Sequence, residues 1–515
     1  MQANDSGVSP LTSSPDRDGT PSPEVAQARW PFWGLIVAIA VFLVQAFYLR
    51  YYSIDDVAIT YRYALHLAEG NGLNWNPGQP PVEGYSNFLW VLFLAGGRHL
   101  GFDIEVFAKV AGAGIGVATL ALLFLLCRRL WAPRQYWWFP PLIVAACPVW
   151  VMWAMSGLEL VSVSFFLVLI IFSLTTSPTW KIRLLSVGLC GLSLSRPEGI
   201  ALAGLFLLFA FFGDRELPRS RRFAVYGVPA LAVVICAAGL LVFRLSYFGY
   251  PVANTVYAKF STSLPSLGKV GSWLFFGLPF LSAYVLLLCK SPTSRHRFVL
   301  GTALVLVIWQ MLLVLPVSIV MYFLHRYQIA FLPLVVLAVP FALDRISQRG
   351  RSLAVVISVL VLVWAIQQWP AVKASYKAER FYYGRHQCVA ERLARLPGRP
   401  LIALLDAGRI PYWSDLPAID VWGLCNSYIA RKGFSTDAVL REAPGPPDVY
   451  IMSVDTQGKD AIPRLGFDKL ISADKFFQEE YKLWQVCPSD YYYGYAILLN
   501  VDWAARNGLG DMLSK

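Results

Sequence analysis

Long apolar segments alternate with short polar connections along most of the chain. Eleven of them resemble membrane spans, which need about 20 apolar residues as helices. They cover residues 33–50, 104–127, 137–154, 159–176, 182–194, 198–213, 223–245, 270–289, 298–320, 327–343 and 352–369. The segments at 182–194 and 198–213 are short, which favours a broken pair of helices that reaches into the protein interior. The pattern predicts a polytopic α-helical membrane protein with about 11 transmembrane helices.

Basic residues between the spans predict the topology. Arginine and lysine clusters accumulate in cytoplasmic loops, and one orientation places all of them there. The clusters are Arg128, Arg129 and Arg134; Lys181 and Arg183; Arg215, Arg219, Arg221 and Arg222; Lys290, Arg295 and Arg297; and Arg345, Arg349 and Arg351. This orientation requires residues 86–100 to lie along the membrane surface. The N-terminus is then cytoplasmic, and the C-terminal part lies outside.

Composition agrees with a membrane protein. The chain has 515 residues, of which 57% are hydrophobic, too many for an ordinary soluble protein. Its net charge of +12 does not indicate nucleic-acid binding, because the basic residues lie in the short loops between spans. Residues 1–28 are rich in Ser, Pro and Asp and predict a disordered cytoplasmic tail. No basic region opens the chain, so the first span is expected to be an uncleaved anchor.

The last part of the chain is more polar. After the spanning module at 29–370, residues 371–515 contain the strand-like runs "RPLIALLD", "PDVYIMSV" and "YYGYAILLNV", separated by loops and helix-like stretches. We expect a small extracytoplasmic α/β domain here.

Six polar motifs fall on the outer side of the predicted topology. They are "SIDD" at 53–56, "VEGYS" at 82–86, "SGLE" at 156–159, "SRPEG" at 195–199, "FGYPVANTVYAK" at 248–259 and "HRYQ" at 325–328. Charged groups at membrane depth are costly and usually mark function. Helix capping and headgroup contacts are the alternative for each motif. Together the six predict one site.

The first motif opens a helix in the outer loop at 51–103. Ser53 and Asp56 have the spacing of a capping box, which predicts a helix that runs to about Glu69. On this helix Asp55 and Arg62 share one face, roughly 10 Å apart along the axis. A carboxylate and a guanidinium facing one cavity could accept a proton and hold an anion.

These motifs carry a family resemblance. The stretch "DDVAITYRYALHLAEGNGLNWNPGQPPVEGYSNFLW", with "SGLE", "RPEG", "FGYPVANTVYAK", "HRY" and "DAGRIPYWSDLPAIDVWGLCNSYIAR", resembles the bacterial GT-C membrane glycosyltransferases of the terminal arabinofuranosyltransferase type. The resemblance extends from about residue 50 to 432. It implies transfer of a sugar from a polyprenyl-phosphate donor to a hydroxyl of a cell-envelope glycan or lipid, with arabinofuranose as the first candidate for the sugar. The reaction would take place on the outer side of the bacterial cytoplasmic membrane. The position that matches the catalytic aspartate is Asp55, with Asp56 beside it.

A departing lipid phosphate needs fixed positive charge. The candidates are Arg62, Lys259, Arg326 and Arg196. Arg326 could hold a phosphate with two hydrogen bonds and Lys259 as a point charge, and snorkelling to the interface is their alternative. Arg196 ranks behind them, because Glu198 could neutralise it.

Sugar and acceptor groups need hydrogen-bonding and aromatic partners. The candidates are Glu83, Tyr85, Asn254, Tyr257, Asp406 and Asp420, with turn formation as the alternative for the two aspartates.

A metal site and a disulfide are further expectations. The resemblance requires no nucleotide and leaves metal dependence open; Asp55, Asp56 and Glu83 could hold Mg²⁺ or Ca²⁺ through oxygen ligands. The histidines and cysteines lack the spacing of a zinc site. Cys388, Cys425 and Cys487 belong to the outer domain, where one disulfide could form by any of three pairings.

Two other functions fit parts of the sequence. A transporter or flippase of lipid-linked substrates would also need many spans and intramembrane charges, but the chain shows no repeat in its two halves. A non-catalytic envelope scaffold would explain the outer domain but would leave "SIDD" without a role.

Overall fold

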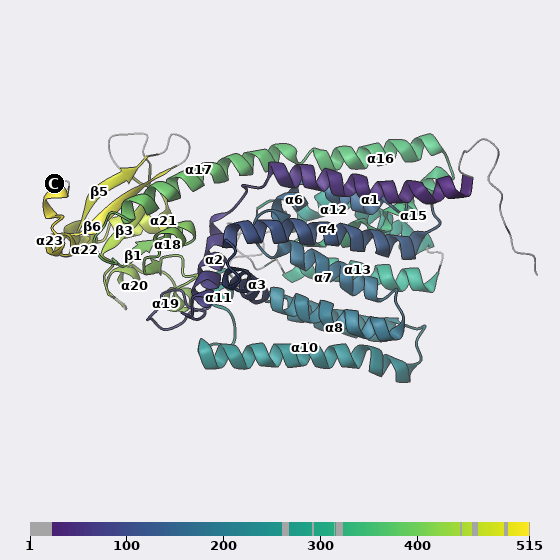
Figure 1. Cartoon of the computed structure of the whole chain (residues 1–515), viewed down its shortest axis with the longest axis horizontal. Coiled ribbons are helices and arrows are strands. Elements are labelled where there is room, and N and C mark those ends of the chain that lie inside the picture. Colours follow the sequence, from purple (N-terminus) through teal and green to yellow (C-terminus); the bar gives the residue numbers. More distant parts are fainter. Residues whose placement is uncertain are drawn as a thin grey trace, which may run out of the picture.

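The computed structural model describes residues 23–259, 267–290, 293–313, 315, 323–442, 445–455, 462–488 and 493–513. It has two parts along one long axis, a helical bundle and a smaller domain with a β-sheet (Figure 1). Most of the predicted tail at 1–28 lies outside the described residues. The fold is that of a polytopic α-helical membrane protein with a C-terminal α/β domain, as predicted from the sequence.

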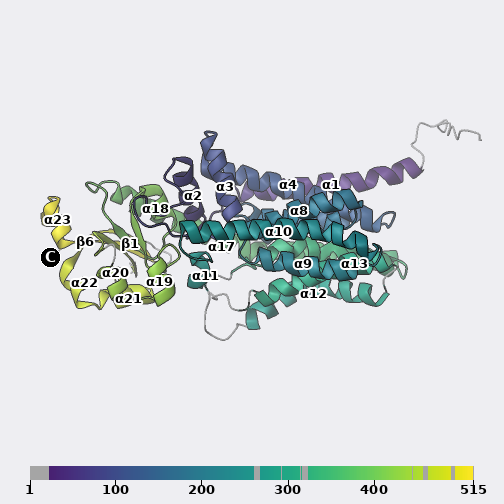
Figure 2. The ribbon, with the colours of Figure 1, turned by 90° about the horizontal axis from the view of Figure 1, so that it is seen from below.

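Helices that run along the long axis form the bundle (Figures 1 and 2). They are α1 (Pro23–Tyr48), α4 (Ile104–Trp131), α5 (Phe139–Ala146), α6 (Pro148–Ala154), α7 (Leu160–Ser173), α8 (Pro178–Ser195), α9 (Gly199–Gly213), α10 (Arg219–Tyr247), α12 (Leu267–Lys290), α13 (Ser294–Leu313), α14 (Leu332–Val335), α15 (Val339–Ser347) and α16 (Arg351–Ile366). Within the described residues, each of the eleven predicted spans falls on helical structure. Five helical segments there are long and apolar enough to cross a membrane, including α4, α10 and α13.

Three predicted spans differ in detail from the structure. The span at 137–154 is divided into α5 and α6 at Pro148, which cannot donate a backbone hydrogen bond. The span at 327–343 consists of the 3₁₀ turns Ile329–Phe331 and Val336–Ala338 joined to α14 and α15. The prediction of a broken pair at 182–194 and 198–213 is wrong, because α8 and α9 are two complete helices packed side by side.

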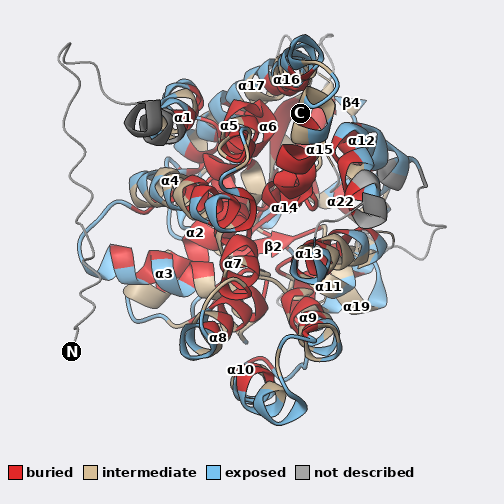
Figure 3. Ribbon diagram, turned by 90° about the vertical axis from the view of Figure 1, so that its right-hand side faces the viewer, coloured by how far each residue is buried: buried red, intermediate tan, exposed pale blue. Residues whose placement is uncertain are grey.

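The outer surface of the bundle is apolar. Val234 and Val242 on α10 are 60% and 65% exposed, and Val359 on α16 is 53% exposed. Buried residues concentrate on the central helices α7 and α14 (Figure 3). Apolar side chains on both the inside and the outside are typical of helices surrounded by lipid.

Short helices cover the end of the bundle next to the sheet domain. They are α2 (Asp55–Ala68), α3 (Phe88–His99) and α11 (Asn254–Lys259). Helix α3 lies across the long axis (Figure 3), which agrees with the prediction that residues 86–100 do not cross the membrane. Ser53 does not cap α2, because its N-cap residue is Ile54 and no side chain caps this end. The capping-box prediction is therefore wrong.

A long helix joins the two parts. Helix α17 (Trp369–Leu393) follows α16 almost directly and projects into the sheet domain (Figure 1). The predicted domain boundary near residue 371 therefore falls at the start of a helix, and the strands begin only at β1.

The C-terminal domain is a mixed sheet between two helical layers. Its strands are β1 (Ile402–Leu404), β2 (Ala418–Asp420), β3 (Val449–Asp455), β4 (Ile462–Pro463), β5 (Tyr481–Cys487) and β6 (Gly494–Asn500), in the order β2-β1-β3-β6-β5 with β4 beside β3. Strands β2, β1 and β3 are parallel, whereas β6 is antiparallel to its neighbours. The three predicted strand-like runs correspond to β1, β3 and β6.

Alternate residues of these strands face different layers. Ile402 and Leu404 pack in the same core as Val389 of α17, whereas Ala403 packs with Val439 on the opposite face. The helices of the sheet domain after α17 are α18 (Arg409–Ser414), α19 (Ser427–Lys432), α20 (Thr436–Leu440), α21 (Gly466–Ser472), α22 (Lys475–Glu480) and α23 (Val501–Arg506). Burial on both faces explains why β1, β3 and β6 are nearly continuous apolar runs.

A disulfide closes this domain against α17. Cys388 and Cys487 are bonded, and Cys425 is a buried free thiol. Among the three pairings that the sequence allowed, the structure therefore has the one that links α17 to β5.

Candidate functional site

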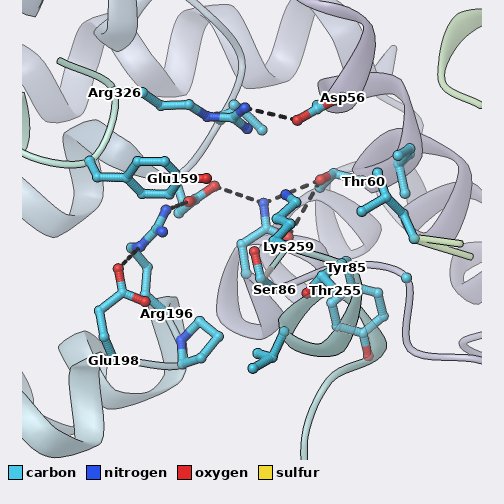
Figure 4. A pocket seen from close by; sticks show the side chains of 18 of the residues that line it. Asp56, Thr60, Tyr85, Ser86, Glu159, Arg196, Glu198, Thr255, Lys259 and Arg326 are labelled. Carbon is cyan, nitrogen blue, oxygen red and sulfur yellow. Dashed lines mark hydrogen bonds and ion pairs between the residues drawn. The ribbon is translucent and has the colours of Figure 1, made fainter. Parts of the chain in front are cut away.

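A pocket of about 330 Å³ lies where the helical bundle meets the short helices α2, α3 and α11 (Figure 4). All six polar motifs predicted from the sequence to share a site contribute to its lining. Their contributions include Asp56, Tyr85, Glu159, Arg196, Lys259 and Arg326. The lining also includes Ile59, Thr60, Asn87, the last turn of α13, and Leu424 of the C-terminal sheet domain, which we call the outer domain after its predicted position. The structure therefore brings the six motifs together in one pocket, whereas its use as a functional site stays a prediction.

Asp56 is the carboxylate of α2 that faces the pocket. Its Oδ2 accepts a hydrogen bond from Arg326 Nη1 at 2.8 Å, and its side chain is 25% exposed. Burial alone would raise the pKa of Asp56, but the positive charges of Arg326 and Lys259 hold this pKa below its ordinary value. Asp56 is therefore ionised at neutral pH and can accept a proton from a bound hydroxyl group.

Lys259 ends α11 and projects into the same pocket. In Figure 4 it lies near the centre of the view, below the pair formed by Asp56 and Arg326. Within the described part of the chain, its ammonium group has no hydrogen bond or ion pair. The pocket thus offers an uncommitted cation near a carboxylate, which is suited to an anionic ligand.

Arg196 lies in the turn between α8 and α9. Its Nη1 donates to Glu159 Oε1 at 2.7 Å and its Nε donates to Glu198 Oε1 at 2.5 Å. The alternative of a self-neutralised arginine, which the sequence left open, is therefore the one observed. Two carboxylates already balance Arg196, so it is a weaker candidate for a phosphate than Lys259 or Arg326.

Asp55 points away from the pocket toward the outer domain. Its two carboxylate oxygens accept hydrogen bonds from the backbone N–H groups of Gly408 at 2.9 Å and Arg409 at 2.8 Å. His386 Nδ1 lies 3.3 Å from the same carboxylate. Burial raises the pKa of Asp55, and the nearby His386 opposes this rise. Asp55 therefore joins the outer domain to the start of α2 and does not line the pocket.

Arg62 has a structural position that differs from the prediction. It is 1% exposed, and it donates to the carbonyl oxygens of Trp75 at 2.9 Å, of Leu416 at 2.8 Å and of Pro411. Burial lowers the pKa of its guanidinium to about 10. The prediction that Asp55 and Arg62 face one cavity is wrong, because both side chains are engaged by the outer domain.

Glu83 and Tyr85 lie in the loop before α3. Both Glu83 oxygens accept hydrogen bonds from Arg244, at 2.8 and 2.9 Å, so this carboxylate is already paired outside the pocket lining. The Tyr85 ring lines the pocket and packs against Tyr63 with ring centres 4.8 Å apart. Only Tyr85 of these two is placed to contact a pocket ligand.

The α11 residues Asn254 and Tyr257 also lie outside the lining. Asn254 Nδ2 donates to the carbonyl oxygens of Gly423 at 2.7 Å and Leu424 at 2.9 Å, which attaches α11 to the outer domain. Tyr257 is 38% exposed, and the Arg431 guanidinium lies 5.0 Å from its ring centre. Neither residue contacts the pocket.

Asp406 and Asp420 belong to the interior of the outer domain. Asp406 accepts hydrogen bonds from the Tyr493 and Tyr495 hydroxyls, the former at 3.1 Å. Asp420 accepts from the N–H groups of Trp422 at 2.8 Å and Cys425 at 2.7 Å, so it stabilises the turn after β2. Burial raises the pKa of Asp420 to about 6. The turn-forming alternative describes Asp420, and neither aspartate reaches the pocket.

The three proposed metal ligands do not converge. Asp55 is bound to backbone N–H groups, Glu83 is bound to Arg244, and only Asp56 lines the pocket. In the part of the chain that the structure describes, no group of three acidic, histidine or cysteine side chains is placed to hold a metal. A requirement for Mg²⁺ or Ca²⁺ stays an untested prediction.

Sequence reasoning missed several residues of the site. Glu159 lies in the "SGLE" motif and lines the pocket, but the motif alone does not assign it a role. The signal for it in the sequence is a lone carboxylate at the start of an apolar span. Asn87 Nδ2 donates to Glu159 Oε2 at 2.8 Å and to Thr60 at 3.2 Å. No local signal indicated His386, because it is more than 300 residues from Asp55 in the chain.

Comparisons with known proteins agree with this fold. No curated protein matches the sequence. Residues 376–499 match the model of a domain of unknown function, DUF8728. ArnT from Cupriavidus metallidurans bound to undecaprenyl phosphate matches with a TM-score of 0.59 and 14% identity, over 91% of this chain and 98% of that chain. The apo state of ArnT matches with a TM-score of 0.56 and 15% identity, over 92% and 98%.

The comparisons identify the fold of the protein. ArnT is a GT-C glycosyltransferase, and the present chain shares its fold over almost the whole length of both proteins. The GT-C fold predicted from the motifs is therefore confirmed, whereas the closer resemblance to arabinofuranosyltransferases stays a prediction.

Proposed function

We propose that the protein transfers a sugar from a polyprenyl-phosphate donor to a hydroxyl group of a cell-envelope acceptor, on the outer side of the cytoplasmic membrane. The observation that carries the proposal is the arrangement of Asp56, Arg326 and Lys259 in one pocket at the end of an apolar bundle. A base and two cations are what such a transfer requires. The likeness to ArnT bound to undecaprenyl phosphate supports a lipid-linked donor.

The reaction assigns a role to each group. The acceptor oxygen forms a bond to the anomeric carbon of the sugar, and the bond from that carbon to the phosphate oxygen breaks. Asp56 takes the acceptor proton, and Lys259 and Arg326 hold the charge that develops on the departing polyprenyl phosphate. Asp56 replaces Asp55 as the proposed base, because both Asp55 oxygens already accept backbone hydrogen bonds.

The pocket position favours a transferase over a transporter. Asp56, Glu159 and Arg196 lie at helix ends or in the turns between helices. Transporter sites typically lie near the middle of the bilayer, between broken helices. Arabinofuranose stays the first sugar to test, on the resemblance of the motifs alone.

Substitution of Asp56, with a second aspartate outside the pocket as the control, tests the proposed base. The purified protein would be supplied with synthetic polyprenyl-phosphate sugars and short glycan acceptors. We expect Asp56→Asn to lose about 10²- to 10⁴-fold in turnover, as is usual for a general base. Asp437→Asn, which alters an exposed aspartate of the outer domain, should retain the wild-type rate. Full turnover by Asp56→Asn would refute the assignment.

A further inference from the structure

The ion pairs of Arg196 form a fixed group on one side of the pocket. In Figure 4, Arg196 and Glu198 lie at the lower left, apart from the Asp56–Arg326 pair at the top. The side chains of Arg196, Glu159 and Glu198 are 13%, 4% and 19% exposed. The mutual ion pairs and this burial hold the three side chains in place before any ligand binds.

This group retains hydrogen-bonding capacity that faces the pocket. Within the described residues, Arg196 Nη2 and Glu198 Oε2 have no hydrogen-bond partner, although both side chains line the pocket. The second oxygen of Glu159 is already used by Asn87. The donor nitrogen Nη2 and the acceptor oxygen Oε2 therefore remain on two side chains that are bonded to each other. Such a pair matches two neighbouring hydroxyl groups, because each hydroxyl can both donate and accept.

Gln310 adds a third polar group to the same pocket. It lies in the last turn of α13 and is 2% exposed, and its Nε2 donates to the Tyr327 carbonyl oxygen at 3.0 Å. Its side-chain oxygen is buried and has no hydrogen-bond partner among the described residues. A buried polar atom without a partner is costly, and a ligand hydroxyl would satisfy it.

We propose that Arg196, Glu198 and Gln310 form the subsite that selects the sugar, and that this sugar is neutral and carries two adjacent free hydroxyl groups. The proposal rests on the proposed function, since it concerns the same pocket. Arg196 is paired with two carboxylates, those of Glu159 and Glu198. This side of the pocket therefore has an excess of negative charge, which disfavours the carboxylate of a uronic acid. Asp56, Arg326 and Lys259 would then act at the reacting end of the donor.

Paired donors test the subsite. One donor is a neutral polyprenyl-phosphate sugar that the wild type uses, and the second lacks one of its two adjacent hydroxyls. We expect the wild type to prefer the complete sugar by about 10- to 100-fold in kcat/KM, the usual effect of a hydrogen bond to a charged group. In Glu198→Gln this preference should fall at least about fivefold, because a neutral amide replaces the charged acceptor.

Two controls separate this role from others. Undecaprenyl phosphate carries no sugar, so Glu198→Gln should bind it with wild-type affinity. Glu391→Gln, which alters an exposed glutamate that accepts a hydrogen bond from Gln387 on α17, should keep the full preference for the complete sugar.

The outcomes distinguish the subsite from the proposed function. Any of three results overturns the subsite proposal and leaves the proposed transferase activity standing. The first is that Glu198→Gln keeps the full wild-type preference, and the second is that it loses affinity for undecaprenyl phosphate. The third such result is that the wild type uses a uronic acid donor as well as the neutral one. If the wild type uses no donor at all, the proposed function fails and the subsite fails with it.

Discussion

The contact between Gly408 and Asp55 gives a sharp test of how the outer domain supports the pocket. A methyl group added at Gly408 would lie 2.1 Å from the Asp55 carbonyl oxygen and 2.5 Å from its Oδ2. Ordinary contact distances are about 3.5–4.0 Å, so Gly408→Ala forces the outer domain and α2 apart by about 1 Å. That movement breaks the hydrogen bonds of 2.9 and 2.8 Å from Gly408 and Arg409 to the Asp55 carboxylate.

The expected magnitude follows from these contacts. Overpacking costs about 1–3 kcal/mol, and each hydrogen bond to a charged group contributes about 1.5–3 kcal/mol. The shift that weakens the hydrogen bonds also relieves the overpacking, so these costs do not add. We therefore expect a net destabilisation of about 2–4 kcal/mol at the contact between the helical bundle and the outer domain. Asp56 is the next residue in α2, and a displacement of about 1 Å near a reacting group costs on the order of 10²-fold in turnover.

The assay measures sugar transfer and thermal unfolding of Gly408→Ala in detergent. Gly384→Ala is the matched control, because it lies within α17 and, among the described residues beyond its own helical turns, no atom lies within 4 Å of the added methyl group. Gly384→Ala should keep the wild-type turnover and should not lower the stability, because alanine favours a helix more than glycine does. Wild-type turnover and stability in Gly408→Ala would refute the proposed coupling between the outer domain and α2.

Three further predictions concern charge and covalent structure. Lys259→Gln removes a positive charge that lowers the pKa of Asp56, so the acid limb of the kcat/KM profile should move to higher pH. An acid limb at the wild-type pH would show that Lys259 does not influence the catalytic base. Arg62→Met removes one hydrogen-bond donor from each of three carbonyl oxygens and should destabilise the protein by about 2–5 kcal/mol in denaturant unfolding; a change below about 0.5 kcal/mol would exclude a structural role for Arg62. Cys388→Ser with Cys487→Ser should lower the stability of the outer domain by about 2–5 kcal/mol, measured against the oxidised wild type, and equal stability would contradict a structural disulfide.

The pH dependence has a definite sign. Because the folded protein holds the pKa of Asp56 below the value of an exposed aspartate, the unfolded chain binds more protons at acidic pH. The stabilisation from Asp56 and Arg326 is therefore complete above about pH 4 and is lost as the pH falls through the lower, folded pKa.

Segment-level properties were accessible from the sequence. The apolar runs predict the helices because lipid and protein core both demand apolar side chains over a length that the bilayer sets. The strand-like runs at β1, β3 and β6 were recognisable because burial on both faces leaves almost no polar residue in them. The six polar motifs predict a common pocket because topology brings their helix ends to one side.

Individual side-chain roles were less accessible, because long-range contacts decide them. Asp55 and Asp56 are adjacent in sequence, yet the first bonds to Gly408 and the second to Arg326. Helical spacing placed Arg62 with Asp55, but its partners come from a loop near residue 75 and from the outer domain. Local periodicity carries no information on which distant segment covers a helix face.

The most direct test of the account is the release of polyprenyl phosphate by the purified wild-type protein, followed together with the appearance of glycosylated acceptor. The account predicts one released lipid phosphate for each sugar transferred. It also predicts that Asp56→Asn still binds undecaprenyl phosphate but neither releases polyprenyl phosphate nor forms glycosylated acceptor. No release from any polyprenyl-phosphate sugar in the panel, or equal release by Asp56→Asn, would contradict it.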